Sequence, residues 1–535
     1  MKLIRTRAGW AVVCAALLVA ACGGDDSSIG MGPSVSSSAS ASNAGAAGQA
    51  AGAAADAPYQ DPNTYSFRGS ASLSAAAAVE KAAVTHHQIV LNGKTVNYTA
   101  TAGHLTASDP GTGKPEASFF YVAYTVDGQP ANTRPVTFFY NGGPGSPTVW
   151  LHLGSFGPKR LVTGMPNANT PTPFPLVDNQ ETLLDTSDLV FVDAIGTGYS
   201  QAIAPNTNKT FWGVDKDGQA FRDFVIRYVA ANQRGASPKY LFGESYGTPR
   251  TDVLANLLEV AGVKLAGVVL QSSILNYNSN CDMSDGESCG GFVPSYGLVG
   301  GYYRLDKPNP IDLAQYATQM RTLTADRFEP AVQAYLRTGA QPSPDLIAAL
   351  SNATGASTSV WQRYVNLDPG TYRAKLLSGT AIGRYDARVN VPVNSPLNGG
   401  DPSSTYITKP FTDTIATYLP NVLKYTVKTT YGMSNNETIG TWNWRHDGLA
   451  MPDTVPDLAA ALTLNPSLKI LSLNGYHDLA TPFYQTELDL GRLGAQPNLT
   501  IRNYQGGHMV YLDDTSRPQE KADLVTFYNR TPAAR

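Results

Sequence analysis

The sequence has few cysteines and no excess of charge of either sign. The formal net charge is −3, so there is no basic field, and nucleic-acid binding is not expected. No segment repeats with a period of 20 to 50 residues, which excludes a solenoid or a propeller. What the chain does have, 42% hydrophobic and 15% charged residues, is typical of a globular protein that buries a large core.

The N-terminus lacks an apolar run long enough to predict a membrane span with confidence. The stretch Ala8 to Ala21 follows three cations and fits a signal peptide. Small residues then precede Cys22, and this pattern resembles the bacterial lipoprotein processing signal. Residues 1–22 are therefore predicted to be a lipoprotein signal peptide, with Cys22 as the lipidated first residue of a protein anchored to the bacterial cell envelope, in the periplasm or at the outer membrane. Ordinary cleavage nearby, with an incidental cysteine, is the alternative.

A low-complexity segment separates this signal from the rest of the chain. Residues 23–58 are rich in Ser, Ala and Gly and have few large apolar side chains. Such a segment cannot bury enough surface to fold, so it is predicted to be a disordered tether. Residues 59–535 are predicted to form the folded domain.

The pentapeptide Gly243-Glu244-Ser245-Tyr246-Gly247 follows an apolar run that ends at Phe242. A G-x-S-x-G sequence between a strand and a helix is the sharp turn that exposes a nucleophilic serine. An ordinary Gly/Ser turn is the alternative. Ser245 is the candidate nucleophile, and the rest of the chain has to supply its base.

Two further strand-like runs are followed by the residues that such a serine needs. Residues 468–474 lead into a loop with Asp478, and residues 499–504 lead into a glycine-rich loop with His508. Ser, Asp and His in this order, each after a strand, is the order of α/β-hydrolases. His477 is the competitor for the base, but adjacent side chains on an extended loop point apart, so Asp478 is not expected to orient it. We therefore assign His508 as the base and Asp478 as its partner.

Acyl transfer also needs hydrogen-bond donors for the oxyanion. The N–H of Tyr246, the residue after the nucleophile, is one candidate. The loop Asn141-Gly142-Gly143-Pro144-Gly145, after the strand-like run Val136 to Tyr140, is expected to supply the second. A phosphate-binding loop is the rival interpretation, but neither a Gly-Lys-Ser/Thr sequence nor GxGxxG spacing is present.

Together, five ordered blocks resemble the serine carboxypeptidases, from about Phe138 to the C-terminus. The blocks are Asn141 to Gly145, Phe191-Val192-Asp193 with Gly196 to Ser200, Gly243 to Gly247, Asp478 with Thr481-Pro482, and Gly507-His508-Met509. The resemblance implies a triad of Ser245, Asp478 and His508, and an oxyanion hole formed by the backbone N–H groups of Gly143 and Tyr246. It also implies that the C-terminal carboxylate of a peptide substrate is held by Asn141, Gly142 and Glu244.

The sequence departs from the family pattern in three places. Phe139 stands where the family has tryptophan, and Ser146-Pro147 stand where it has a cysteine and serines. Ser155 stands where a second acidic residue is expected to share a proton at the carboxylate site. Neighbouring side chains that could substitute for it are Lys159, Arg160 and His152. The triad is unaffected, so acyl transfer is better supported than release of C-terminal residues.

Two alternative functions follow from these departures. An esterase or acyltransferase on the same scaffold, acting on a small acyl ester, is the first, because one triad serves amides and esters. A non-catalytic surface binding lipoprotein is the second. The triad argues against the second, since a binding protein needs none of its three side chains.

Cys281 and Cys289 are the two cysteines that remain in the folded domain. An exported protein meets an oxidising compartment, and the eight-residue separation allows a disulfide. Free thiols or a metal pair are the alternatives, but no histidine lies close by in sequence. The acidic loop between them lacks EF-hand spacing. We expect neither a metal nor a cofactor.

The strand pattern predicts the α/β-hydrolase fold. Strand-like runs Ile89 to Thr101 and Phe119 to Tyr124 are expected to pair as an antiparallel edge. Beyond this edge we expect a mixed, mainly parallel sheet with helices on both faces. The long stretch between the nucleophile helix and residue 468 predicts a large cap insertion at about residues 275–465, with helix-period runs at Ile311 to Tyr335 and Asp345 to Leu350.

Overall fold

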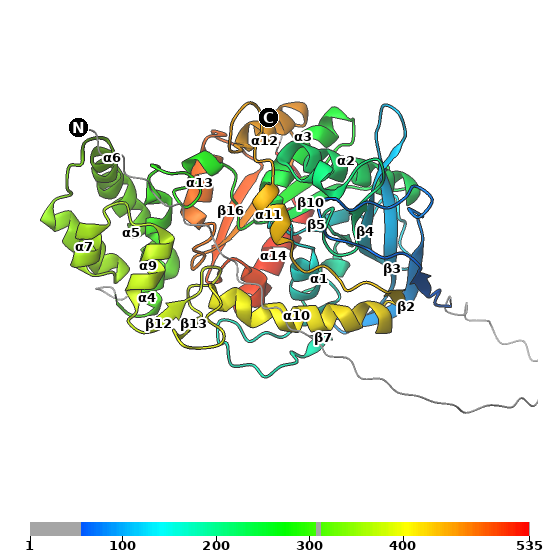
Figure 1. Ribbon diagram of the computed structural model, residues 1–535, viewed down its shortest axis with the longest axis horizontal. Coiled ribbons are helices and arrows are strands. Elements are labelled where there is room, and N and C mark those ends of the chain that lie inside the picture. Colours follow the sequence, from blue (N-terminus) through cyan, green and yellow to red (C-terminus); the bar gives the residue numbers. More distant parts are fainter. Residues whose placement is uncertain (1–54, 306–311, 534–535) are drawn as a thin grey trace, which may run out of the picture. The chain divides into compact units, whose positions relative to one another are not determined.

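The apolar runs build one ten-stranded sheet in the computed structural model, which describes residues 55–305 and 312–533 (Figure 1). The strand order is β16-β15-β11-β10-β5-β8-β4-β3-β2, and β9 pairs with β4. The strands are β2 (Ala82–Leu91), β3 (Lys94–Ser108), β4 (Pro115–Val126), β5 (Val136–Tyr140), β8 (Asp188–Val192), β9 (Gln201–Ala202), β10 (Lys239–Glu244), β11 (Gly267–Gln271), β15 (Lys469–Gly475) and β16 (Leu499–Tyr504). Pairing is parallel from β16 to β8 and antiparallel from β8 to β2, so the predicted mixed, mainly parallel sheet is confirmed.

The N-terminal predictions fall almost entirely outside the described residues. The signal peptide 1–22, Cys22 and most of the tether 23–58 belong to the part of the chain that is not described. Asp56 and Ala57, near the predicted end of the tether, already contact β2: Ala57 bridges Val84, and the backbone N–H of His86 donates to Asp56 Oδ1 at 2.8 Å. None of the helices among the described residues is both long and apolar enough to span a membrane.

The antiparallel edge contains one strand more than the sequence pattern predicted. The run Ile89 to Thr101 is not a single strand, because the chain reverses at Asn92 and Gly93, whose φ angles are +50° and +75°. Two successive residues with positive φ make the type I′ turn that joins β-hairpin strands. β2 therefore pairs with β3, and β3 pairs with β4 as expected, with Thr101 opposite Ala123.

Both faces of the parallel strands are covered, which explains their uninterrupted apolar sequences. Along β5, Phe138 packs against α2 (Val214–Ala231), α3 (Gly247–Val260) and α12 (Val455–Leu464) on one face. The next residue, Phe139, belongs to the opposite face, with α1 (Val149–Gly154), α10 (Pro402–Asn421) and α14 (Ser516–Asn529). Phe139 stacks between Phe191 and Phe242, both at 4.8 Å between ring centroids, so the position where the family has tryptophan is filled by core packing.

The first half of the cap is a helical subdomain with its own core. Its helices are α4 (Val293–Tyr302), α5 (Leu313–Leu323), α6 (Glu329–Thr338), α7 (Pro344–Thr354), α8 (Thr358–Arg363) and α9 (Pro369–Leu376). They pack around buried apolar side chains that include Phe328, Val332 and Trp361. This group lies to one side of the sheet, beyond β16 (Figure 1).

The elements of the second half of the cap pack against the hydrolase core. A hairpin of β12 (Thr380–Ile382) and β13 (Asn390–Pro392) precedes α10, and β14 (Tyr425–Val427) pairs with β1 (Tyr59–Asp61). The short helix α11 (Asn436–Thr441) leads to α12, which packs on α3 as part of the helical layer. The outer strands β6 (Lys159–Leu161) and β7 (Leu176–Asp178) pair with each other, and α13 (Phe483–Gly491) follows β15.

Candidate active site

Ser245 occupies a sharp turn at the carboxyl end of β10. Its φ angle is +59°, and α3 begins two residues later. Both glycines of the pentapeptide are required by close backbone contacts: a Cβ at Gly243 would lie 2.1 Å from the carbonyl oxygen of Gly247, and a Cβ at Gly247 would lie 2.8 Å from that of Tyr140. Ser245 is partly exposed although its neighbours are buried. The turn therefore presents a serine side chain at the edge of the sheet.

His508 and Asp478 form a buried pair at the same edge. His508 Nδ1 lies 2.8 Å from Asp478 Oδ2 and donates to it. The backbone N–H groups of Ala480 and Thr481 donate to Asp478 Oδ1 at 2.7 and 3.1 Å, and the Thr481 hydroxyl donates to Oδ2 at 2.7 Å. These donors fix the carboxylate, so Nδ1 of His508 carries the proton and Nε2 is left as the acceptor.

The backbone and the ring of His508 are held by the cap. Its N–H donates to the carbonyl oxygen of Tyr385 at 2.6 Å, and the Tyr385 ring stacks on the imidazole at 4.6 Å. Burial lowers the pKa of His508, but the charge of Asp478 and its hydrogen bond, together with the charge of Glu244, outweigh burial and raise the pKa above its ordinary value. A histidine with these partners is suited to accept a proton from a hydroxyl group.

His477, the alternative base, has a different environment. Its Nδ1 bonds to the carbonyl oxygen of Gln505, and its ring lies edge-on to Tyr302. Burial lowers the pKa of His477 to about 4. The geometry therefore favours His508 as the partner of Asp478.

The glycine-rich loop after β5 lies directly against the turn at Ser245. β5 and β10 are adjacent, and Tyr140 is opposite Gly243. A Cβ at Gly142 would lie 2.4 Å from the backbone nitrogen of Tyr246, so only glycine allows this approach. Gly143 follows with a φ angle of +107°. The structure thus brings together the two segments that contain the predicted oxyanion donors, Gly143 and Tyr246.

The predicted carboxylate-binding residues meet at a buried glutamate. Glu244 is almost fully buried, and burial raises its pKa to about 7. The side-chain amide of Asn141 interacts with both Glu244 and Tyr511, while its Oδ1 accepts from the backbone N–H of Leu151 at 3.0 Å. The Tyr511 hydroxyl donates to Glu244 Oε2 at 2.6 Å. Sequence reasoning missed Tyr511, because a tyrosine in an apolar run indicates only core packing.

Ser155 brings no acidic group to this cluster. Its hydroxyl donates to the carbonyl oxygen of Leu151 at 2.5 Å within its own turn. The side chains considered as substitutes contact other partners. Lys159 pairs with Asp178, Arg160 lies 3.9 Å from Glu181, and His152 bonds to the Tyr124 hydroxyl at 2.6 Å.

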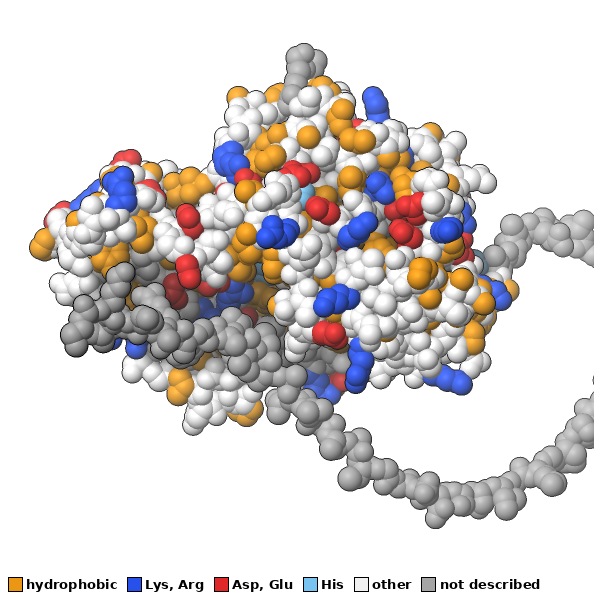
Figure 2. All heavy atoms as spheres, turned by 45° about the horizontal axis from the view of Figure 1, so that its top comes forward, with side chains coloured by type: hydrophobic (Ala, Val, Ile, Leu, Met, Phe, Trp, Pro, Cys, Tyr) orange, Lys and Arg blue, Asp and Glu red, His pale blue; other side chains and the backbone are white. Residues whose placement is uncertain are grey.

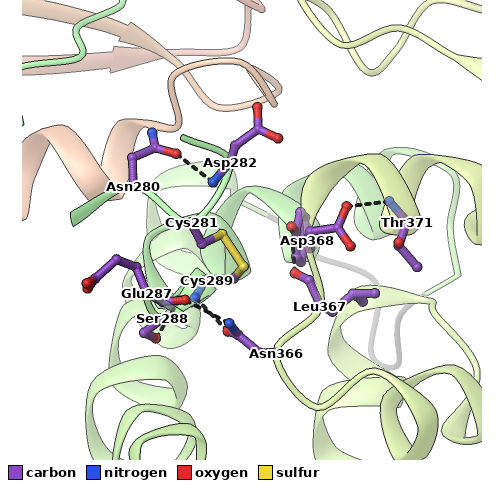
Figure 3. The surroundings of a disulfide bond; sticks show 12 residues. Asn280, Cys281, Asp282, Glu287, Ser288, Cys289, Asn366, Leu367, Asp368 and Thr371 are labelled. Atoms are coloured by element: carbon purple, nitrogen blue, oxygen red, sulfur yellow. Dashed lines mark hydrogen bonds between the residues drawn. A yellow bond between two sulfur atoms is a disulfide. The ribbon is translucent and has the colours of Figure 1, made fainter. Parts of the chain in front are cut away.

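The predicted disulfide between Cys281 and Cys289 is confirmed and belongs to the cap (Figure 3). The side-chain amide of Asn366 ties the loop down. It accepts from the backbone N–H of Cys289 at 2.8 Å and donates to the carbonyl oxygen of Glu287 at 2.7 Å. The disulfide thus closes the loop 281–289, and the hydrogen bonds of Asn366 connect this loop to the segment before α9.

A histidine and carboxylate cluster that the sequence did not predict lies in the second half of the cap. His446 Nδ1 bonds to Asp215 Oδ1 at 2.6 Å and Nε2 bonds to Asp457 Oδ2 at 2.8 Å, while Asp447 lies 3.8 Å away. The hydrogen bond to Asp457 raises the pKa of His446 to about 9 against the effect of burial. Both ring nitrogens donate in the charged form, so this cluster is an ion-pair network that ties residues 443–449 to α2 and α12.

Comparison with known proteins supports the fold and gives a family match over part of the chain. Residues 91–260 match the family model of the serine carboxypeptidases, a segment that contains Asn141 to Gly145 and Ser245. Among solved structures, the chain is similar to Kex1, a prohormone-processing carboxypeptidase from Saccharomyces cerevisiae, with 16% identity over 80% of this chain and 91% of that chain and a TM-score of 0.53. A proline iminopeptidase from Mycobacterium smegmatis shares 15% identity over 80% of this chain and 97% of its own, with a TM-score of 0.34. The fold is that of the α/β-hydrolases.

Proposed function

We propose that this chain, which matches the serine carboxypeptidase family model over residues 91–260, releases C-terminal residues from peptides through an acyl-enzyme formed on Ser245. The observation that carries the proposal is the position of Glu244. A buried carboxyl group with a pKa near 7 lies next to the nucleophile and is hydrogen-bonded by a phenol. A hydrolase that needs only its triad has no use for such a group.

The triad would work as follows. His508 Nε2 accepts the hydroxyl proton of Ser245 as the serine oxygen attacks the peptide carbonyl. The oxyanion that forms is stabilised by the backbone N–H groups of Gly143 and Tyr246. His508 then gives its proton to the leaving amine, and water repeats the sequence to release the acid. Asp478 keeps the imidazole in the required tautomer and stabilises its charged form, and the four hydrogen bonds that its carboxylate accepts keep Asp478 in place.

Carboxylate recognition would depend on the proton of Glu244. At neutral pH about half of the molecules carry this proton, given a pKa of about 7. A protonated Glu244 donates to the terminal carboxylate of the peptide, and the Asn141 amide holds Glu244 in place beside it. Gly142, which packs against the backbone of Glu244 and Tyr246, is the third residue that the resemblance assigns to this site.

An esterase or acyltransferase is the second candidate function. It is favoured by Ser155, which supplies no acidic group at the position where the family resemblance places the second one. The triad and the oxyanion hole would be unchanged, and only the substrate would differ.

Hydrolysis of one blocked peptide, offered as the free acid, the C-terminal amide and the ester, separates the two candidates. Preference for the free acid, abolished in Ser245→Ala, is the expected result. Cleavage of the ester with no preference for the free acid would assign the chain to the esterases. A fully active Ser245→Ala variant would overturn both candidates.

We also propose that the protein is exported and anchored to the cell envelope through Cys22. Support comes from the sequence alone, namely the apolar stretch, the small residues before Cys22 and the Ser/Ala/Gly-rich tether. Labelling with an alkyne-tagged fatty acid in bacteria should modify the wild type and not Cys22→Ser. Labelling that persists in the variant would rule this anchor out.

A further inference from the structure

Tyr511 lies where a substrate-binding site and the catalytic histidine meet. It belongs to the short 3₁₀ turn Val510–Leu512, three residues after His508, and it is fully buried. Its ring packs against the end of α1, where a Cβ at Gly154 would lie 3.0 Å from the Tyr511 ring carbon Cε2. This packing fixes the ring, and the hydroxyl group donates a hydrogen bond to Glu244 Oε2 at 2.6 Å.

The hydroxyl of Tyr511 is always a donor in this position. Burial, and then the charge of Glu244, raise the pKa of Tyr511 well above its usual range. A neutral carboxyl group has one oxygen that accepts and one that carries the proton. Because Tyr511 donates to Oε2, the proton of neutral Glu244 is placed on Oε1.

Asn141 adds a donor of fixed direction. Its Oδ1 is used by the backbone N–H of Leu151, so its amide hydrogens are turned toward Glu244 and Tyr511. A carboxylate that arrives beside Ser245 would meet Oε1–H of Glu244, while the Asn141 amide holds Glu244 and Tyr511 in place. One phenol, one amide and one carboxyl group therefore replace the pair of acidic residues that the resemblance led us to expect.

We propose that Tyr511 is a positioning residue that determines specificity for a free C-terminal carboxylate, by holding Glu244 so that its proton is on Oε1 and faces the substrate. The inference rests on the proposed carboxypeptidase function and assigns to it a residue outside the predicted site.

Other titratable groups face the same cluster. His508 and Asp478 act on Glu244 from the triad, with opposite signs. Glu520 of α14 is fully buried, and neither of its carboxyl oxygens has a hydrogen-bond partner among the described residues. Burial and the charge of Glu244 raise the pKa of Glu520 well above its usual range, so it stays neutral. Of the two glutamates in this cluster, Glu244 is thus the one whose proton exchanges near neutral pH.

The variant Tyr511→Phe removes the donor and keeps the ring. For a blocked peptide with a free C-terminus we expect KM to rise about tenfold with kcat within about twofold of the wild type, since one hydrogen bond to the carboxyl group is lost. Hydrolysis of the matched ester should be unchanged. Tyr418→Phe is the control, because it also removes a buried phenol hydroxyl, bonded to the Tyr124 hydroxyl at 2.9 Å, and should leave both substrates unaffected.

The outcomes separate this inference from the proposed function. A wild type that does not distinguish the free acid from the ester overturns the carboxypeptidase proposal and the inference with it. A wild type that prefers the acid, with the same preference in Tyr511→Phe, overturns the inference alone. Equal losses on acid and ester would show a structural role and also overturn it.

A second variant keeps the inference testable if Tyr511→Phe does not fold. In Glu244→Gln, the Tyr511 hydroxyl should orient the new amide with its oxygen toward Tyr511 and its NH₂ toward the substrate. Preference for the free acid should then survive and become independent of pH between 6 and 8, an interval of about one unit on each side of the Glu244 transition. Complete loss of that preference would contradict the assigned orientation.

Discussion

Glu244 is the residue whose ionisation should be seen most directly in the kinetics. Below pH 7 it carries the proton that a substrate carboxylate needs, and above pH 7 it repels that carboxylate. The kcat/KM for a free-acid peptide should fall about tenfold for each pH unit above the transition. The ester should instead gain activity as His508 loses its proton, with its limb above that of an ordinary histidine because the pKa of His508 is raised.

The two limbs of this profile belong to a coupled pair, because Glu244 and His508 act on each other. Removing the charge in Glu244→Gln should lower the pKa of His508 and move the acid limb for the ester to lower pH. Measurement of both substrates from pH 5 to 9, a span of about two units on either side of neutrality, tests the assignment. Identical profiles for acid and ester in the wild type would contradict it.

His446 should contribute to stability in a pH-dependent way. Its pKa is about 9 in the folded protein, against about 6.5 in the unfolded chain. Because the folded pKa is raised, the stabilisation is complete below about pH 6.5 and is lost as pH rises through about 9. His446→Gln should lower the free energy of unfolding by about 2 kcal/mol at pH 6, since it leaves the buried Asp457 carboxylate without its cation.

Urea unfolding of the wild type and His446→Gln at pH 6 and pH 10 tests this reasoning. The difference between the two proteins should shrink at the higher pH. An equal difference at both values would mean that the imidazole acts through packing and not through its charge.

At the residue scale, the local sequence was enough to identify the candidate triad, whose catalytic role stays a prediction. The G-x-S-x-G turn and the order Ser, Asp, His placed Ser245, Asp478 and His508 on one edge of the sheet, and the structure brings Asp478 and His508 together there. Tyr511 and His446 could not be predicted in this way. Their partners, Glu244 and Asp215, are more than two hundred residues away in sequence, and only the fold brings them near.

At the scale of elements, the clearest error was the missed hairpin turn at Asn92 and Gly93. The sequence contained the information needed to predict it. Asn-Gly between alternating apolar residues predicts a type I′ turn, and reading Ile89 to Thr101 as one run overlooked it. The parallel strands were predicted well because burial on both faces leaves a continuous apolar sequence. The sequence did not show where the cap insertion ends. Helix α12 lies within the predicted cap range, but it packs on α3 and so belongs to the core, and only the fold reveals this contact.

The turn gives a stability prediction. Gly93→Ala should lower the free energy of unfolding by about 1 kcal/mol, because the φ angle of +75° strains any residue with a Cβ. Nothing lies within 4 Å of the added methyl group, so the cost is conformational.

Gly235→Ala is the matched control for this substitution. Its Cβ also meets nothing within 4 Å, and its φ angle lies outside the positive range. It should be neutral or slightly stabilising. Equal destabilisation of the two variants by urea unfolding would show that the hairpin turn is not the cause.

For the whole molecule, composition and motif order predicted the class and the fold. The face shown in Figure 2 carries Lys, Arg, Asp and Glu side chains interspersed with one another, in keeping with the small net charge. The sequence also predicted the disulfide, from two cysteines eight residues apart. The lipid anchor stays a prediction, because Cys22 lies outside the described residues.

The most direct test of the proposed function is mass spectrometry of an N-terminally blocked peptide of about ten residues after incubation with the enzyme, a length chosen so that each lost residue gives a resolved mass. The proposal predicts a ladder of products that lose one residue at a time from the C-terminus, and no ladder with Ser245→Ala. An internal cut, or an intact peptide under conditions in which a simple ester is hydrolysed, would contradict it.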